Sequence, residues 1–332
     1  MNYKESNEIL GEINKAKKIL VNLHRGPDPD SFACAFALYY FLCSLNKDVD
    51  IVLTSTSDLS NQLSQMDDSK LIKFVDYAKF NFSKYDLFIT SDSGSWQQIV
   101  DNPAVKIPDI PIVVIDHHES NDKFGKINLV DSSAVSCAQI IYLLFKDWDF
   151  FVDTQMANLL MIGIIADSGG FAFSNDSKVM RVAADLMELG ADKVKIINEL
   201  FRTQKFGQVK AWGEYLVRLK LDEEHKFIWT AISYEDYMKY RIPPKASSMV
   251  ATQYSSIVDG TNFGIVMNED EKETLKISLR SRNPNFDVSK LGEQLGGGGH
   301  KMAAGGMITG LPFDKAVEKV LETARKYAKE NK

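Results

Sequence analysis

Short apolar runs and helical patterns alternate along the first half of the chain. Runs of about five residues rich in Val, Ile and Leu, bounded by polar residues, are typical of buried strands. Between them, apolar residues recur at helical spacing or fill Ala-rich stretches. This alternation predicts an α/β fold with a doubly wound, mainly parallel sheet. The predicted strands are Ile19–Leu23, Val49–Leu53, Tyr85–Thr90, Ile110–Ile115 and Lys126–Val130, and the predicted helices are Lys4–Lys18, Phe32–Leu45, Ala134–Phe145 and Met156–Ala166.

The pattern changes in the second half of the chain. Residues 178–221 are helical in pattern, with Gly190 as a stop between helices. With 332 residues, the chain is expected to form two domains, 1–190 and 222–332, joined by a helical connector at 191–221. The second domain is predicted to be a smaller α/β unit. Its strands are Phe227–Ile232, Asn262–Met267 and Thr274–Leu279, and its helices are Ala246–Ile257 and Phe313–Lys329.

The net charge narrows the classes of partner. It is −6, whereas proteins that bind long nucleic acid gain affinity from many Lys and Arg contacts to phosphate. We therefore expect no long nucleic acid as a partner. A phosphate-bearing substrate would be short and held by metals or by a local basic patch.

The apolar runs and the cysteines of the chain indicate its cellular location. No apolar run reaches the roughly 20 residues that span a bilayer, and the N-terminus has no apolar signal core. Cys34, Cys43 and Cys137 show neither a disulfide framework nor metal-type spacing. These features predict a cytoplasmic protein with no membrane partner, and they leave open whether it forms a homodimer.

Acidic and imidazole side chains follow several predicted strands, and one ends the helix at 156–166. Each segment alone has a plain explanation, because Asp and Ser beside Gly or Pro form turns and helix N-caps; Asp30 or Ser31 is the expected N-cap of the helix at 32–45. In an open α/β sheet, however, the carboxyl ends of the strands meet at one edge, so these residues are expected to lie together. They are His24, Asp28, Asp30, Asp92, Asp116, His117, His118 and Asp167.

So many carboxylates at one edge need cations or protons to neutralise them. Two carboxylates about 4 Å apart repel by roughly 4 kcal/mol at an effective dielectric constant near 20. Carboxylate and imidazole without thiolate suit Mn²⁺ or Mg²⁺, or else Fe²⁺ or Co²⁺. The ligands are too many for one ion, and a carboxylate that bridges two ions is a common device for hydrolysing phosphate esters.

A run of four glycines, Gly296–Gly299, precedes His300 in the second predicted domain. A flexible surface turn explains such a run when it stands alone. Here Arg280 and Arg282 alternate at the end of a predicted strand, so they are expected to point the same way. Backbone N–H groups of the glycines can form an anion-binding nest, and arginine is well shaped for phosphate. We interpret the region as the local basic patch that a phosphate substrate requires.

The order of the acidic motifs resembles that of the DHH superfamily of phosphoesterases. Two departures, Ser31-Phe32 where many relatives have Gly-Ser and Gln139 where an acid is frequent, remove no metal ligand. The resemblance implies a dinuclear centre, normally of manganese, with Mg²⁺ or Co²⁺ as substitutes. It also implies one role for each residue: His24 and Asp28 bind the first ion, Asp30, His117 and Asp167 bind the second, Asp92 bridges them, His118 faces the scissile phosphate, and Asp116 supports the ligands.

Two further segments, Ser278–Arg282 and 296–306, resemble the substrate-binding domain that accompanies the DHH domain in one branch of the superfamily. The resemblance implies two lobes with the substrate in the cleft between them. The substrate would be held by Arg280, Arg282, Gly297, Gly298, Gly299 and His300.

The resemblance implies a substrate class as well. Compact two-domain members act on very short oligoribonucleotides, on pApA or on 3′-phosphoadenosine 5′-phosphate. We therefore expect a manganese-dependent phosphoesterase that cleaves such substrates, with RNA of about two to five nucleotides, by in-line attack of a hydroxide bridging two metals. The alternatives are a cyclic-di-AMP phosphodiesterase of the same family and a nucleotide-binding sensor without hydrolysis.

Overall fold

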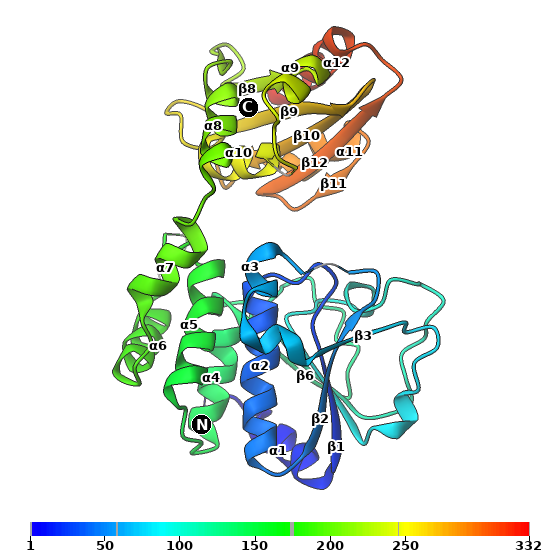
Figure 1. Cartoon of the computed structure of the whole chain (residues 1–332), viewed down its shortest axis with the longest axis vertical. Helices are drawn as coiled ribbons and strands as arrows, with labels where there is room; N and C mark the ends of the chain where they lie inside the picture. The colour runs from blue at the N-terminus through cyan, green and yellow to red at the C-terminus, as the bar shows by residue number, and fades with distance from the viewer. Residues whose placement is uncertain (1, 58, 173–175, 245, 332) are drawn as a thin grey trace. The chain divides into compact units, whose positions relative to one another are not determined.

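A computed structural model describes residues 2–57, 59–172, 176–244 and 246–331, without the side chain of Asn61 (Figure 1). The chain forms two compact units, unit 1 (Met1–Thr203) and unit 2 (Gln204–Lys332). The segment 191–221, expected as a connector, divides between them. Ile196 packs in the core of unit 1, whereas Trp212 and Tyr215 pack in a cluster of unit 2.

Unit 1 is built on a six-stranded parallel sheet with the order β3-β2-β1-β4-β5-β6. The direction of strand order reverses between β1 and β4, where Asn22 is in register with Thr90. The predicted α/β fold with a parallel sheet is confirmed. β3 was not predicted, because only Ile72 of its four residues is buried. The strands are β1 (Lys18–Asn22), β2 (Asp48–Thr54), β3 (Ile72–Val75), β4 (Leu87–Ser91), β5 (Ile112–Asp116) and β6 (Ile127–Val130).

Helices cover one face of this sheet, and aromatic loops cover the other. On the second face Tyr77, Phe88 and Trp96 pack together, and among the described residues this cluster includes none from an α-helix. The sheet of unit 1 thus has the strand order of a doubly wound fold, but α-helices pack on only one of its faces among the described residues. Two further helices, α6 and α7, pack against α5. The short helix α3 completes the unit. The helices are α1 (Ser6–Lys15), α2 (Pro29–Ser44), α3 (Asn61–Ser64), α4 (Cys137–Asp147), α5 (Thr154–Asp167), α6 (Ser177–Glu188) and α7 (Lys193–Phe201).

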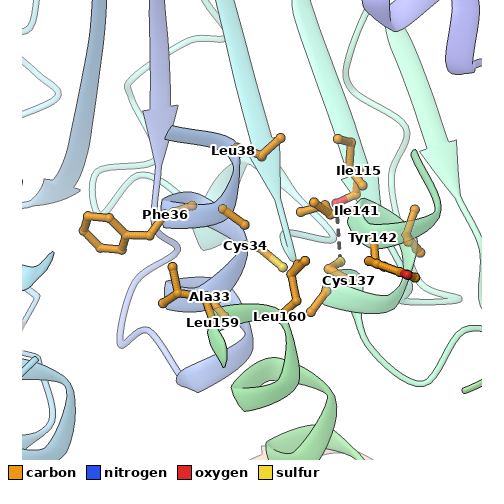
Figure 2. Close-up of a cluster of buried hydrophobic side chains, with 14 of the residues drawn as sticks. Ala33, Cys34, Phe36, Leu38, Ile115, Cys137, Ile141, Tyr142, Leu159 and Leu160 are labelled. Carbon is orange, nitrogen blue, oxygen red and sulfur yellow. Dashed lines mark hydrogen bonds between the residues drawn. The ribbon is translucent and has the colours of Figure 1, made fainter. Parts of the chain in front are cut away.

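The core of unit 1 is concentrated where α2, α4 and α5 meet (Figure 2). α2 is buried on every side from Asp30 to Leu38, as expected for a helix that is apolar all round. Cys34 and Cys137 are free buried thiols there, and Cys137 Sγ donates to Ile115 O over 3.4 Å. Each large aliphatic side chain fully buried in this core contributes about 1.5–3 kcal/mol. The hydrogen bond from Cys137 to β5 and the packing of this core hold the start of α4 against both the sheet and α2.

The first turn of α2 differs from the prediction. The helix begins at Pro29, and its N-cap is Asp28, whose Oδ1 accepts a hydrogen bond from Ser31 N at 2.9 Å. The expected N-cap at Asp30 or Ser31 is therefore wrong. Proline suits the first helical position, because that N–H has no partner within the helix.

Unit 2 has a mixed six-stranded sheet with the order β11-β12-β10-β9-β8-β7. Among the described residues of this unit, only β8 and β9 pair in parallel. β12 has the sequence Ala-Ala-Gly-Gly-Met-Ile-Thr, and its small residues gave no strand signal. The strands are β7 (Lys220–Asp222), β8 (Phe227–Ile232), β9 (Phe263–Glu271), β10 (Thr274–Ser281), β11 (Gly298–Gly299) and β12 (Ala303–Thr309).

Helices cover both faces of the second sheet. One cluster joins the sheet to α8, α9 and α10, and another joins it to α11 and α12. In the described ranges, no helix combines the length and the apolar content needed to cross a membrane. The helices are α8 (Phe206–Leu216), α9 (Tyr234–Lys239), α10 (Ala246–Tyr254), α11 (Val288–Gln294) and α12 (Phe313–Glu330).

Candidate metal centre

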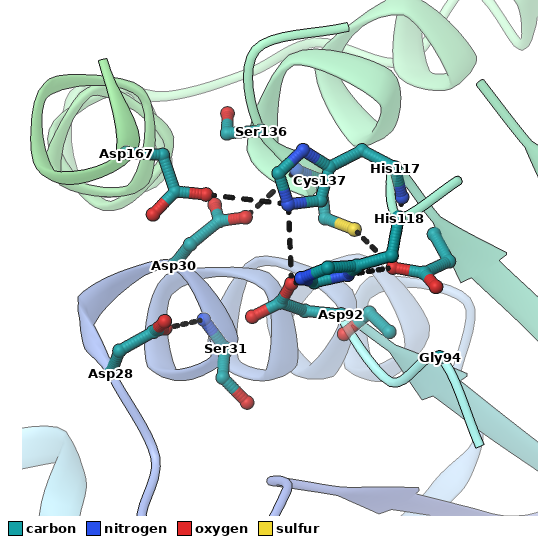
Figure 3. A network of polar contacts seen from close by, with 12 residues as sticks. Asp28, Asp30, Ser31, Asp92, Gly94, His117, His118, Ser136, Cys137 and Asp167 are labelled. Atoms are coloured by element: carbon teal, nitrogen blue, oxygen red, sulfur yellow. Dashed lines mark hydrogen bonds and ion pairs between the residues drawn. The ribbon is translucent and has the colours of Figure 1, made fainter. Parts of the chain in front are cut away.

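The predicted ligands converge at the carboxyl edge of the first sheet, beside the point where the strand order reverses. His24 follows β1, Asp92 follows β4 directly, and Asp116 is the last residue of β5. The start of α2 and the end of α5 add Asp28, Asp30 and Asp167 (Figure 3). Ligand sites in open α/β sheets lie at this kind of edge.

His24 lies between two carboxylates. Its Nε2 is 3.4 Å from Asp92 Oδ2 and 3.8 Å from Asp28 Oδ1. Its Nδ1 lies 3.0 Å from Arg25 O, and its backbone N–H donates to Ser31 Oγ at 3.2 Å. An Nδ1–H bonded to a carbonyl leaves Nε2 with a free lone pair, which is the form that binds a metal. His24, Asp28 and Asp92 therefore form one candidate ligand group.

His117 belongs to a second group. Its Nε2 is 3.5 Å from Asp167 Oδ2 and 3.5 Å from Asp92 Oδ1, and its Nδ1 lies 3.4 Å from Ala134 O. Ligand atoms of Asp30, His117 and Asp167 all lie within 4.8 Å of one another. Asp92 thus turns one oxygen towards each group.

The backbone at Asp92 is unusual. Its φ is +55°, a left-handed conformation that Asp and Asn tolerate better than most residues. Its N–H still donates to Ile115 O of β5 at 3.0 Å, so the residue leaves the sheet while its strand stays paired. Backbone strain of this kind persists where the surroundings fix it, and it clusters at functional sites.

Asp30 is completely buried and is held by the N-terminus of α4. Its Oδ2 accepts from Cys137 N at 2.7 Å, and its Oδ1 accepts from Ala138 N at 3.1 Å. These are the first two N–H groups of α4, which have no partner within the helix and favour an anion. Burial, together with Asp92 and Asp28, nevertheless raises the pKa of Asp30 to about 7.

Without a cation, the carboxylates of the cluster are neutralised only by protons that the cluster itself takes up. Burial and the neighbouring Asp30 raise the pKa of Asp167 to about 10. Burial opposes charge on His24 and His117, but the facing carboxylates outweigh it and raise the pKa of these imidazoles to about 10 and about 9. Among the described residues, no Lys or Arg forms an ion pair with any carboxylate of the cluster. Oxygen and imidazole donors with excess negative charge fit hard divalent cations.

Asp116 and His118 form a hydrogen-bonded pair beside the ligand groups, and His118 Nδ1 also lies 3.7 Å from Asp92 Oδ1. Asp116 is completely buried, and its Oδ1 accepts from His118 Nδ1 and from His117 N, both at 2.8 Å. Hydrogen bonding to Asp116 raises the pKa of His118. Because Nδ1 is used in this way, the Nε2 atom of this partly exposed ring is the one left for a substrate.

Two residues of the site were missed by sequence reasoning. Asn121 donates to Asp116 Oδ2 at 2.6 Å and to Ser93 O at 3.2 Å, so it fixes the Asp116–His118 pair. Its position three residues after His118 was the only available signal. Cys137 lies near Asp30 and Asp92, and its Sγ is 3.7 Å from Asp116 Oδ1. Burial raises the pKa of the Cys137 thiol, which keeps it protonated and a poor metal ligand.

The predicted arginines of unit 2 contact different segments. Arg280, on β10, donates to Thr252 Oγ1 of α10 at 3.0 Å, and burial lowers its pKa. Arg282 lies just beyond the strand and pairs with Asp259 at 3.0 Å. His300 is exposed in the turn between β11 and β12. Both arginines therefore already have partners within the fold.

The glycine run is explained largely by the chain's own backbone. A Cβ at Gly297 would lie 2.3 Å from Gly305 O, and one at Gly299 would lie 2.6 Å from Ala303 O. The Gly297 N–H donates to Gly292 O at 2.9 Å, and Gly298 and Gly299 pair with β12. The expected row of free N–H groups is therefore interrupted at Gly297, and the N–H of His300 is also used, by Ala303 O at 2.8 Å. Gly298 is the position with open space around it.

Comparisons with known proteins agree with the two-unit arrangement. Residues 18–164 match the DHH family, N-terminal domain, and residues 226–330 match the DHHA1 domain. The first range contains all the predicted metal ligands except Asp167, which lies three residues beyond its end. The chain belongs to the DHH superfamily, in the branch whose members carry a DHHA1 domain.

Individual relatives match over nearly the whole chain. A bifunctional oligoribonuclease and PAP phosphatase NrnA of Thermus thermophilus is 27% identical, over 97% of this chain and 94% of the relative. The protein of the same name from Bacillus subtilis is 25% identical, over 91% of this chain and 92% of the relative. The crystal structure of an exopolyphosphatase-related protein from Bacteroides fragilis has a TM-score of 0.88 at 24% identity, covering 98% of this chain and 97% of that one. The last likeness shows the fold.

Proposed function

We propose that the chain is a metal-dependent phosphohydrolase acting on short nucleotides. The observation that carries the proposal is the placement of Asp92, with Oδ2 3.4 Å from His24 Nε2 and Oδ1 3.5 Å from His117 Nε2. A carboxylate that faces two ligand groups is suited to bridging two cations. The names of the relatives from T. thermophilus and B. subtilis support the activity.

Two groups of side chains would hold the cations. His24, Asp28 and Asp92 would bind the first, and Asp30, Asp92, His117 and Asp167 the second. We propose Mn²⁺ as the resident ion, with Mg²⁺ or Co²⁺ as substitutes, because the donors are carboxylate oxygens and imidazole nitrogens. When bound, the cations would activate the attacking water and neutralise charge on the phosphoryl oxygens.

His118 would act on the substrate directly. Its Nδ1 is held by Asp116, and Asn121 fixes Asp116 from the opposite oxygen. The raised pKa of His118 favours the imidazolium form, which can donate a hydrogen bond from Nε2 to a phosphoryl oxygen or protonate the leaving group. Asp116 and Asn121 would keep the ring in this orientation.

The substrates that we propose are RNA of about two to five nucleotides, pApA and 3′-phosphoadenosine 5′-phosphate. A short substrate suits a protein of net charge −6, because few phosphates need neutralising. In unit 2 we retain Arg280, Arg282, Gly298, Gly299 and His300 as candidates for holding it. Gly297 is left out, because its N–H is already bonded to Gly292 O.

A chromatographic panel tests the proposal. The protein would be stripped of metal, resupplied with Mn²⁺, and incubated with RNA of two to seven nucleotides, pApA, 3′-phosphoadenosine 5′-phosphate and cyclic-di-AMP. We expect turnover of the short linear substrates only when metal is present. Preferred cleavage of cyclic-di-AMP would indicate the alternative phosphodiesterase, whereas tight dinucleotide binding without products would indicate a sensor and overturn the proposal.

A further inference from the structure

Gly163 stands in the middle of α5, where glycine is unfavourable. A glycine inside a helix is destabilising relative to alanine, because it loses more backbone freedom on folding. The residue is buried, and its φ is not in the left-handed region, so the backbone conformation does not require glycine. The reason for glycine must therefore lie in what surrounds it.

A side chain at this position would collide with a candidate metal ligand. A Cβ at Gly163 would lie 2.2 Å from Asp30 Oδ1, 2.7 Å from Ala138 Cβ and 3.3 Å from Asp30 Cα. Distances below 3.0 Å force the neighbouring atoms to move. α5 packs against both α2 and α4 here, so neither neighbour can withdraw without disturbing the helix contacts.

The Asp30 carboxylate has little freedom to turn away. Both of its oxygens accept backbone N–H groups of α4, from Cys137 at 2.7 Å and from Ala138 at 3.1 Å. A rotated carboxylate would leave these N–H groups buried without a partner. If α5 moved instead, it would carry Asp167, which lies one helical turn after Gly163. Either response displaces a member of the group Asp30, His117 and Asp167.

We propose that Gly163 is a positioning residue for the second cation: its missing side chain leaves the space that sets the carboxylate of Asp30. The inference rests on the two-cation function proposed above. It predicts that Gly163→Ala weakens Mn²⁺ binding at the site of Asp30, His117 and Asp167 by about tenfold or more. Mutations of residues that support metal ligands commonly have effects of this size. Binding at the site of His24, Asp28 and Asp92 should persist.

The test is a titration of metal-free protein with Mn²⁺, followed by calorimetry and electron paramagnetic resonance. The wild type is expected to bind two ions per chain and to show the signal of an exchange-coupled pair. Gly163→Ala is expected to bind one ion tightly and to show a mononuclear signal. In an Asp30→Ala, Ala138→Gly background, where the added Cβ meets neither the carboxylate nor the Ala138 Cβ, adding Gly163→Ala should cause no further loss of Mn²⁺ affinity.

Three variants separate positioning from packing. Gly11→Ala, in α1, adds a Cβ with no atom within 4 Å and should leave Mn²⁺ binding unchanged. Leu160→Ala, in the same helix as Gly163, should lower the melting temperature by opening a cavity, yet keep both ions. Gly163→Ala combined with Ala138→Gly removes the contact with the Ala138 Cβ and leaves the contact with the carboxylate. This double variant should fold even if the single one does not, and it should still lose one ion.

The outcomes distinguish this inference from the proposed function. If the wild type binds no pair of Mn²⁺ ions, the two-cation function fails, and the role of Gly163 fails with it. If the wild type binds two ions and the Gly163 variants bind both with unchanged affinity, only the role of Gly163 is overturned. A further, additive loss of Mn²⁺ affinity when Gly163→Ala is added to the Asp30→Ala, Ala138→Gly background would also overturn it.

Discussion

At the edge of the unit 1 sheet, Asp30, Asp92 and His117 face one another with no lysine or arginine partner among the described residues, whereas in unit 2 Arg282 already pairs with Asp259. The difference shows how strongly each region points to a ligand. Carboxylates gathered at one edge, where burial raises the pKa of Asp30 and Asp167, need cations or protons to neutralise them. Arginines and glycines that the fold itself uses are weaker evidence of a binding site.

The largest expected effect concerns Asp92. Asp92→Asn should lower turnover by about three powers of ten, because the bridge between the two ligand groups loses its charge and several kcal/mol of stabilisation. Mn²⁺ content, measured by atomic emission, should fall as well. Asp109→Asn, which changes an exposed acid outside the site, is the matched control. Full activity of Asp92→Asn would show that Asp92 has no part in the chemistry.

The two adjacent histidines should separate into different roles. His117→Ala should lose bound Mn²⁺, whereas His118→Ala should keep both ions and lose about a hundredfold in kcat, as expected for a general acid. Metal analysis and kinetics on the same preparations test this. Loss of Mn²⁺ from His118→Ala would move His118 into the ligand set.

Proton release should accompany metal binding to unit 1. The pKa of His24 is raised to about 10 and that of His117 to about 9, so both imidazoles carry protons at pH 7 and must lose them to bind a cation. Affinity for Mn²⁺ should therefore rise between pH 6 and pH 8, by about tenfold per unit for each proton released. Calorimetry in buffers of different ionisation enthalpy measures the number of protons. A binding heat that does not depend on the buffer would contradict the expectation.

The smallest effect is expected in unit 2. Arg282→Gln should raise KM about tenfold without changing kcat, because it removes one charge-assisted contact to phosphate. The control is Asp259→Asn, which frees the guanidinium and should leave KM unchanged or lower it. If Arg282→Gln left KM unchanged, the arginine would serve only an exposed ion pair, which contributes less than about 1 kcal/mol.

The edge of the first sheet could be predicted because strand ends are visible in sequence. His24, Asp92 and Asp116 each follow a short apolar run, and parallel pairing brings such ends together. Asp28 and Asp30 came with the same motif, although the N-cap of α2 was placed wrongly. Gly163 and Cys137 gave no signal, because their proximity to Asp30 depends on how α2, α4 and α5 pack.

In unit 2 the glycine run misleads sequence-based prediction for a related reason. The glycines at 297 and 299 indicate that another group lies close to the backbone at these positions. The sequence does not identify that group. The structure shows that β12 occupies that space. β12 itself was missed, because Gly305 and Gly306 interrupt its pattern.

The left-handed backbone at Asp92 limits which residues can replace it. Glutamate keeps the charge but favours this conformation less, while asparagine keeps the conformation and loses the charge. The substitution that the backbone tolerates best is thus the one that removes the charge of the carboxylate proposed to bridge the two cations. A descendant of this protein could therefore exchange catalysis for simple nucleotide binding through one conservative replacement, with its fold unchanged.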